Sequence, residues 1–132
     1  MSEAAARRWR ETWLRAWPEQ DVEAIRGLYA DDAVFRSHPF RDTHDGAEGV
    51  AEYARWAFAD EEAPAEVWFG EPFVGGDHAT CEYWAVVRSE GREQTIAGVS
   101  VLRFGPDGLV VTQRDYWAIE DGRREPPEGW GR

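Results

Sequence analysis

The chain has 132 residues, of which 42% are hydrophobic and 14% aromatic; this is the size of one domain, with enough apolar surface to form one core. Its formal net charge is −11, and so acidic a surface repels nucleic acid backbones and anionic membranes. No stretch approaches the roughly 18 apolar residues that span a bilayer, and residues 1–10 lack the apolar run of a secretory signal. We therefore expect one cytoplasmic domain that binds neither nucleic acid nor membrane.

The first half of the chain carries helical patterns. Trp9, Trp13 and Trp17 recur at every fourth position, which places the three indoles on one face of a helix over residues 4–17. Pro18 follows directly, and proline disfavours continuation of a helix. The sequence therefore predicts a first amphipathic helix that ends near this proline.

Two more helices are expected before the pattern changes. Asp21 is a suitable N-cap for an amphipathic helix over residues 22–29. Asp45 and Glu48 have the spacing of a capping box, and apolar residues continue behind them at helical period as far as residue 58. We expect the third helix to begin there.

The second half of the chain is typical of strands. Apolar stretches alternate with turn sequences such as Gly75-Gly76-Asp77, which indicates an antiparallel meander. A shorter strand precedes His38-Pro39, because proline disfavours continued pairing. The predicted strands are residues 33–37, 65–74, 78–88, 93–104 and 109–118.

Helices followed by a meander predict an α+β fold in which a curved, mixed or antiparallel sheet wraps around three N-terminal helices. Residues 120–132 mix glycine, proline and charge without a period. We therefore expect a domain over residues 1–119 and a loosely ordered C-terminal tail over residues 120–132.

Several motifs resemble the nuclear transport factor 2-like superfamily, and within it the SnoaL-like domains. They are Leu28-Tyr29-Ala30-Asp31-Asp32-Ala33, His38-Pro39-Phe40, the Gly46 that opens the third helix, and Arg114-Asp115-Tyr116-Trp117. The resemblance covers about residues 5–118 and implies a cone-shaped α+β barrel with a central pocket. The superfamily includes ketosteroid isomerases, limonene-epoxide hydrolases and polyketide cyclases beside members that only bind or scaffold, so the activity depends on the pocket residues.

Similarity to the ketosteroid isomerases concerns three positions. By resemblance, the general base of those enzymes falls on His38, their oxyanion tyrosine near Trp13 and their oxyanion acid on Ser100. A titratable group remains at the first position, but an indole and a hydroxyl donate weaker hydrogen bonds than a protonated carboxylic acid. Steroid isomerisation is therefore disfavoured.

The last predicted strand relates the chain to the other two enzyme classes. Arg114-Asp115-Tyr116 resembles the motif that carries one carboxylate of limonene-epoxide hydrolases, but the arginine and the second aspartate of that site fall on Cys81 and Tyr83. Epoxide hydrolysis by that mechanism is thus disfavoured. SnoaL-like cyclases are similar in using a last-strand aspartate as acid and base, and Asp115 is the candidate for that position.

Residue chemistry supports a catalytic pair. Gln113, Asp115 and Trp117 alternate along one face of a strand, which the resemblance assigns to the cavity. A carboxylate among indoles loses solvation, and this raises its pKa toward the range useful for proton transfer. His38, with an ordinary pKa of about 6.5, is the predicted counterpart, unless the two side chains touch and Asp115 only orients the imidazole. Structural roles stay open for both: His38 binding a loop carbonyl, and Asp115 holding an arginine or a backbone N–H.

The remaining predicted ligand contacts are aromatic and hydroxyl side chains, for which ordinary core packing is the alternative. They are Trp13, Phe40, Tyr53, Trp56, Tyr83, Ser100 and Trp117. We expect no metal and no cofactor, because the histidines and the single cysteine form no close cluster. Cys81 is expected to be a small buried hydrophobe.

Two functions remain open. The first is a cofactor-independent acid-base enzyme, of isomerase, cyclase or hydratase type, that acts on an apolar, ring-containing metabolite, with Ser100 and Trp13 donating hydrogen bonds. The alternative is a non-catalytic dimeric module of the same fold that binds a small ligand or an interaction partner. In both, the resemblance implies a homodimer through the outer sheet face, where Trp84 is expected to lie.

Overall fold

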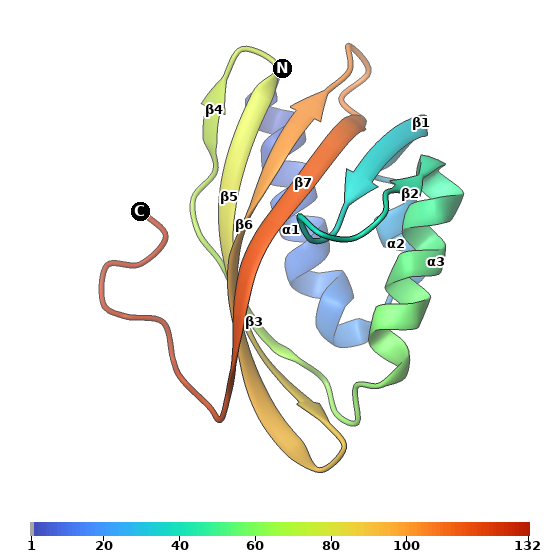
Figure 1. The fold of residues 1–132 in the computed structure, drawn as a ribbon. Coiled ribbons are helices and arrows are strands. Elements are labelled where there is room, and N and C mark those ends of the chain that lie inside the picture. Colours follow the sequence, from blue (N-terminus) through green and yellow to red (C-terminus); the bar gives the residue numbers. More distant parts are fainter. Residues whose placement is uncertain (1) are drawn as a thin grey trace.

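The computed structural model describes residues 2–132, and its helices lie on one side of a curved sheet (Figure 1). The helices are α1 (Ser2–Glu19), α2 (Val22–Arg26) and α3 (Gly46–Ala59). The strands are β1 (Tyr29–Arg36), β2 (His44–Asp45), β3 (Glu66–Phe69), β4 (Phe73–Gly75), β5 (His78–Ser89), β6 (Arg92–Phe104) and β7 (Val110–Asp121). Among the described residues, no helix combines the length and the apolar character needed to cross a membrane.

The strand order is β2-β1-β7-β6-β5-β3, and β4 also pairs with β5. Strands β1 and β7 are parallel, whereas the other pairs are antiparallel. The sheet is open, with β2 at one edge and β3 and β4 at the other, and it bends around the helices (Figure 1). The predicted α+β class, a curved sheet around three N-terminal helices, is confirmed.

Helix α1 contributes its tryptophan face to the core, as its spacing predicts. Trp9 and Trp13 are 2% and 8% exposed, and Trp17 packs edge-on against Trp13 with ring centroids 6.3 Å apart. Pro18 lies in the last turn of the helix. The three indoles therefore form one continuous aromatic wall facing the sheet.

The second predicted helix is wrong in its last turn. Asp21 does cap α2, since its side chain accepts a hydrogen bond from the N–H of Ala24 at 3.1 Å, but the helix ends at Arg26 and Gly27 is its C-cap. Tyr29 already belongs to β1. Glycine after a helix favours termination there, and Tyr29, which was expected on the helix, is part of the sheet.

Two further local expectations are corrected. The predicted strand over residues 65–74 is two short strands, β3 and β4, separated by Gly70-Glu71-Pro72; proline has no N–H to donate within a strand. Asp45 makes no capping hydrogen bond to α3. Instead Gly46, with a φ of 75°, lets the chain turn into the helix, where a Cβ would lie 2.7 Å from the carbonyl oxygen of Asp31.

The long strands β5, β6 and β7 confirm the predicted meander and set the register of the site. Ser100 on β6 lies opposite Cys81 on β5 and opposite Asp115 on β7. Side chains that lie directly opposite one another in a sheet share a face. Ser100 and Asp115 therefore point together toward the helices.

The C-terminal residues lie on the sheet face opposite the helices (Figure 1). The indole N–H of Trp84 donates to the carbonyl oxygen of Arg124 at 2.8 Å, and the Trp84 and Trp130 rings pack edge-on at 5.9 Å. The N–H of Glu71 donates to the carbonyl oxygen of Gly131 at 2.7 Å. These contacts join the tail to the sheet; the division of the chain at residue 119 stays a prediction.

Gly98 on β6 provides a test of the packing between the central strands of the sheet. A Cβ at this position would lie 2.6 Å from Cβ of Trp117 and 2.8 Å from Cζ of Tyr83, so Gly98→Ala should lower the free energy of unfolding by about 1–3 kcal/mol. Gly75→Ala is the matched control, because nothing lies within 4 Å of its added Cβ. Urea unfolding measures both variants, and equal midpoints would contradict the packing described.

Candidate functional site

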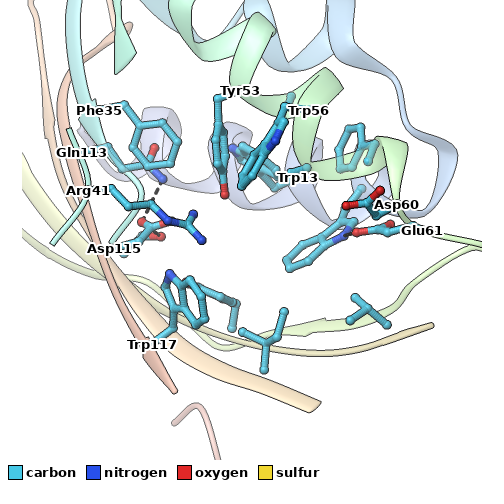
Figure 2. A pocket seen from close by; sticks show the side chains of 18 of the residues that line it. Trp13, Phe35, Arg41, Tyr53, Trp56, Asp60, Glu61, Gln113, Asp115 and Trp117 are labelled. Atoms are coloured by element: carbon cyan, nitrogen blue, oxygen red, sulfur yellow. Dashed lines mark hydrogen bonds between the residues drawn. The ribbon is translucent and has the colours of Figure 1, made fainter. Parts of the chain in front are cut away.

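A cavity of about 220 Å³ lies between the sheet and helices α1 and α3. Its walls are largely aromatic and include Trp13, Trp17, Trp56, Trp117, Tyr53 and Tyr83. Figure 2 shows two polar ends, with Arg41, Gln113 and Asp115 at one and Asp60 and Glu61 at the other. This volume is below the roughly 300–1,000 Å³ of pockets for drug-sized ligands and suits a ligand of one or two rings.

Asp115 projects into the cavity from β7 with one oxygen held and the other free. The Ser100 hydroxyl and the Gln113 side-chain amide both donate to Oδ1, at 2.6 Å and 3.0 Å. No hydrogen bond from residues 2–132 reaches Oδ2. Burial raises the pKa of Asp115 to about 7, and the two hydrogen bonds oppose that shift. At neutral pH the carboxyl is therefore present in both protonation states.

A buried hydrogen-bond chain connects Asp115 to helix α1. The side-chain oxygen of Gln113 accepts from the Tyr29 hydroxyl at 2.6 Å and from the Trp9 indole at 3.2 Å. These two donors fix the amide so that its nitrogen faces Asp115. The Trp13 indole N–H donates to the Tyr29 hydroxyl at 3.1 Å. The expectation that Trp13 offers its N–H to a ligand is thus wrong, although its ring does line the cavity.

His38 and Phe40 do not line the cavity. A turn is closed by the hydrogen bond from the N–H of Arg41 to the carbonyl oxygen of His38, at 3.1 Å, and it leaves Phe40 91% exposed. The His38 ring packs edge-on against Trp117 at 4.9 Å, and its Nδ1 accepts from the N–H of Phe40. The structure therefore does not bring Asp115 and His38 together in one chamber, contrary to the expectation from the sequence.

Arg41 is the charged group that this turn does bring to the cavity. Its guanidinium carbon lies 5.3 Å from the ring centroid of Trp117 and 5.4 Å from that of Trp56, and Nη1 donates to the Ser37 hydroxyl at 3.2 Å. Such stacking on two indoles is favourable for a guanidinium. Sequence reasoning missed Arg41; the signal was its place three residues after His38, where a turn reverses the chain.

The other predicted contacts lie where the sequence placed them. Tyr53 and Trp56 on α3, Tyr83 on β5, Ser100 on β6 and Trp117 on β7 all line the cavity. Burial raises the pKa of Tyr53 to about 12 and that of Tyr83 well above its ordinary value, so both hydroxyls are neutral hydrogen-bond donors. The expectation that Ser100 donates its hydroxyl proton to a ligand is wrong, because that hydroxyl donates to Asp115. The roles of the other four as ligand contacts stay predictions.

Cys81 contributes no reactive thiol to the cavity, and the described residues form no metal-binding cluster. Cys81 is 1% exposed, and burial raises the pKa of its thiol to about 12, in agreement with a packing role. Within residues 2–132, no three His, Cys, Asp or Glu side chains are grouped to hold a metal ion.

The charge of Asp115 gives a pH-dependent stability. Its pKa is about 7 in the folded chain against an ordinary 3.8, so the folded state holds the proton more tightly and stability falls as the pH rises between these values. Asp115→Asn keeps an acceptor oxygen for Ser100 and Gln113 but carries no charge. Between pH 5 and pH 8 we expect the thermal midpoint of the natural chain to fall. The midpoint of the variant should fall less, and the two decreases should differ by at least about 4 °C.

Circular dichroism at each pH measures these midpoints. The exposed Asp32 on β1 provides the control, because Asp32→Asn removes one charge outside the cavity and should leave the natural pH dependence in place. Identical pH dependence in the Asp115→Asn variant and the natural chain would contradict the described environment of Asp115.

Known proteins share this architecture. A family model for the SnoaL-like domain matches residues 10–113. The epoxide hydrolase/cyclase-like enzyme SalBIII, connected with pyran ring formation in salinomycin, has a TM-score of 0.78 and 19% identity over 92% of this chain and 100% of its own. A ketosteroid isomerase-like protein from Catenulispora acidiphila, in complex with trimethylamine, has a TM-score of 0.73 and 22% identity over 82% and 83% of the two chains.

An LEH-like epoxide hydrolase from Mycobacterium tuberculosis has a TM-score of 0.69 and 18% identity, covering 89% of this chain and 82% of its own. At these identities the similarity shows a common fold. No curated protein matches the chain. Because the family model spans most of the sequence and the fold agrees with it, the chain belongs to the SnoaL-like domain family, within the nuclear transport factor 2-like superfamily.

Proposed function

We propose that the protein is a cofactor-independent acid-base enzyme acting on a small, apolar, ring-containing metabolite, and that Asp115 transfers the proton. One observation carries the proposal. Oδ1 of Asp115 is held by Ser100 and Gln113, whereas Oδ2 has no hydrogen-bond partner within residues 2–132, and the side chain lines an aromatic cavity. A pKa of about 7 lets the same carboxyl accept a proton and return it at neutral pH.

The geometry suggests how such a transfer proceeds. Oδ2 of Asp115 removes a proton from a carbon beside a carbonyl group of the ligand, and the electrons of the broken C–H bond move to the carbonyl oxygen. The permanent positive charge of Arg41 stabilises this oxygen. Asp115 then returns the proton to another atom of the ligand, which completes an isomerisation or accompanies ring closure. Arg41 thus takes the place in the cavity that the sequence had suggested for His38.

The structural neighbours are compatible with this chemistry. SalBIII is described as an epoxide hydrolase/cyclase-like enzyme, and another neighbour as an epoxide hydrolase. Both reactions require proton transfer within a pocket that also accommodates apolar carbon. Their sequence identities to this chain are 19% and 18%. At this distance the two neighbours support a class of reaction but do not identify a substrate.

A non-catalytic ligand-binding module is the second candidate. The observation that favours it is the position of His38, because without that imidazole the Asp115 end of the cavity has a single group that titrates near neutrality. A computationally designed binder of 17-OHP has a similar fold, with a TM-score of 0.69 and 22% identity.

In either function we propose a homodimer through the outer sheet face, where Tyr116 is 45% exposed. Light scattering after size-exclusion chromatography tests this oligomeric state.

Hydrogen exchange tests catalysis without knowledge of the natural substrate. In deuterium oxide, the protein should accelerate deuterium incorporation beside the carbonyl of at least one small cyclic ketone from a panel of cyclohexenone, indanone and tetralone, followed by proton NMR. Asp115→Asn should lower the accelerated rate by about 100-fold or more. The rate in the natural chain should rise with pH up to about 7, as Asp115 becomes ionised.

Asp32→Asn serves as the control and should exchange at the natural rate, since Asp32 is exposed on β1 outside the cavity. Equal exchange rates in the Asp115→Asn variant and the natural chain would refute the catalytic role of Asp115. Saturable binding of the ketones without any acceleration would favour the ligand-binding module instead.

A further inference from the structure

A second carboxyl lies at the end of the cavity away from Asp115 (Figure 2). Glu61 follows α3 closely, and its Oε2 accepts a hydrogen bond from the Trp17 indole at 3.0 Å. Its other oxygen, Oε1, is enclosed and forms no hydrogen bond within residues 2–132. The side-chain amide of Gln20 lies beside this carboxyl but donates to the carbonyl oxygen of Phe58 at 3.3 Å. Glu61 and its neighbour Asp60 both line the cavity. The proposed acid-base chemistry uses neither of them.

An enclosed carboxylate oxygen without a partner is unfavourable and is uncommon in native proteins. The described ion pairs join the acidic surface residues to arginines, but none of them includes Glu61. Rotation about the terminal torsion of a glutamate is soft, so that Oε1 can turn toward the cavity when a donor is present there. The missing partner is therefore best supplied by a ligand.

Aromatic rings line the cavity beside this carboxyl, and Trp17 turns its N–H edge toward it. Trp17 packs edge-on against Trp13 at 6.3 Å and against Tyr83 at 6.2 Å, and all three rings line the cavity. Aromatic faces attract cations, most strongly where water is excluded. The net charge of −11 also draws cations toward the protein.

We propose that this end of the cavity binds a protonated amine of the ligand, with Glu61 accepting an N–H hydrogen bond and the indoles of Trp13 and Trp17 facing the cation. The inference rests on the proposed function, because it names the ligand class of the same cavity: an apolar ring compound with an amine at one end and its reacting carbon near Asp115. An ammonium group satisfies both the unpaired oxygen and the carboxylate charge. A hydroxyl group satisfies the oxygen alone.

Three probes of matched shape test the proposal: naphthylmethylamine, naphthylmethanol and methylnaphthalene, substituted at the same ring position. Isothermal titration calorimetry at pH 7.5 measures their binding to the natural chain. We expect the amine to bind about tenfold more tightly than the alcohol, since a charge-assisted hydrogen bond is roughly twice as strong as a neutral one. This comparison needs no variant and so does not depend on how a substitution affects folding.

Two variants then assign the effect to one residue. Glu61→Gln keeps an oxygen that accepts from Trp17 but removes the charge, and it should weaken amine binding about tenfold while leaving the alcohol within about twofold. Glu62→Gln makes the same charge change at the adjacent exposed residue, where the side chain accepts from the N–H of Gly91. Amine binding should stay within about twofold of the natural chain in this control.

The outcomes separate this inference from the function on which it rests. Equal affinity of the natural chain for amine and alcohol, or equal loss of amine binding in the Glu61→Gln and Glu62→Gln variants, would overturn the amine site while the cavity remains a ligand site. Failure of all three probes to bind the natural chain would overturn both the amine site and the proposed function.

Discussion

Two hydrogen bonds to one oxygen of Asp115 determine the character of the cavity. Ser100 and Gln113 hold Oδ1, so the carboxyl keeps one orientation although its surroundings are aromatic. Desolvation disfavours its charge and the two donors favour it, and the balance leaves the pKa at about 7. A carboxyl in this cavity without these donors would be protonated at neutral pH. A carboxyl on the protein surface would be ionised at neutral pH. Acid-base work at neutral pH requires the intermediate case.

The fold provides this balance through elements that are distant in sequence. Register between β6 and β7 places Ser100 opposite Asp115. Gln113, two residues before Asp115 on the same face, is oriented by the Tyr29 hydroxyl and the Trp9 indole, so α1 and β1 help to fix the carboxyl. The cavity leaves two carboxyls with raised pKa values, at Asp115 and Glu61, and burial of charge at these positions lowers stability above neutral pH.

The sequence predicted those features that depend on regular periodicity. The tryptophan spacing of α1, the meander and the alternation along β7 place Asp115 and Trp117 in the cavity, and strand pairing adds Ser100. The turn that starts at His38 was beyond such reasoning, because one hydrogen bond from Arg41 to the His38 carbonyl decides which side chains face inward. For that reason His38 and Phe40 were misplaced and Arg41 was missed. Glu61 was missed because its enclosure depends on Trp17, which is distant in the chain.

The central claim, that Asp115 titrates near neutrality inside the cavity, is tested most directly by carbon NMR of the aspartate carboxyl groups. The signal lost in the Asp115→Asn variant identifies the residue, and its shift is then followed from pH 3 to pH 9 in the natural chain. The structure predicts a midpoint of about 7. A midpoint near the ordinary value of about 3.9 would show a solvated carboxylate and would contradict a proton-transferring role for Asp115 in a dry aromatic cavity.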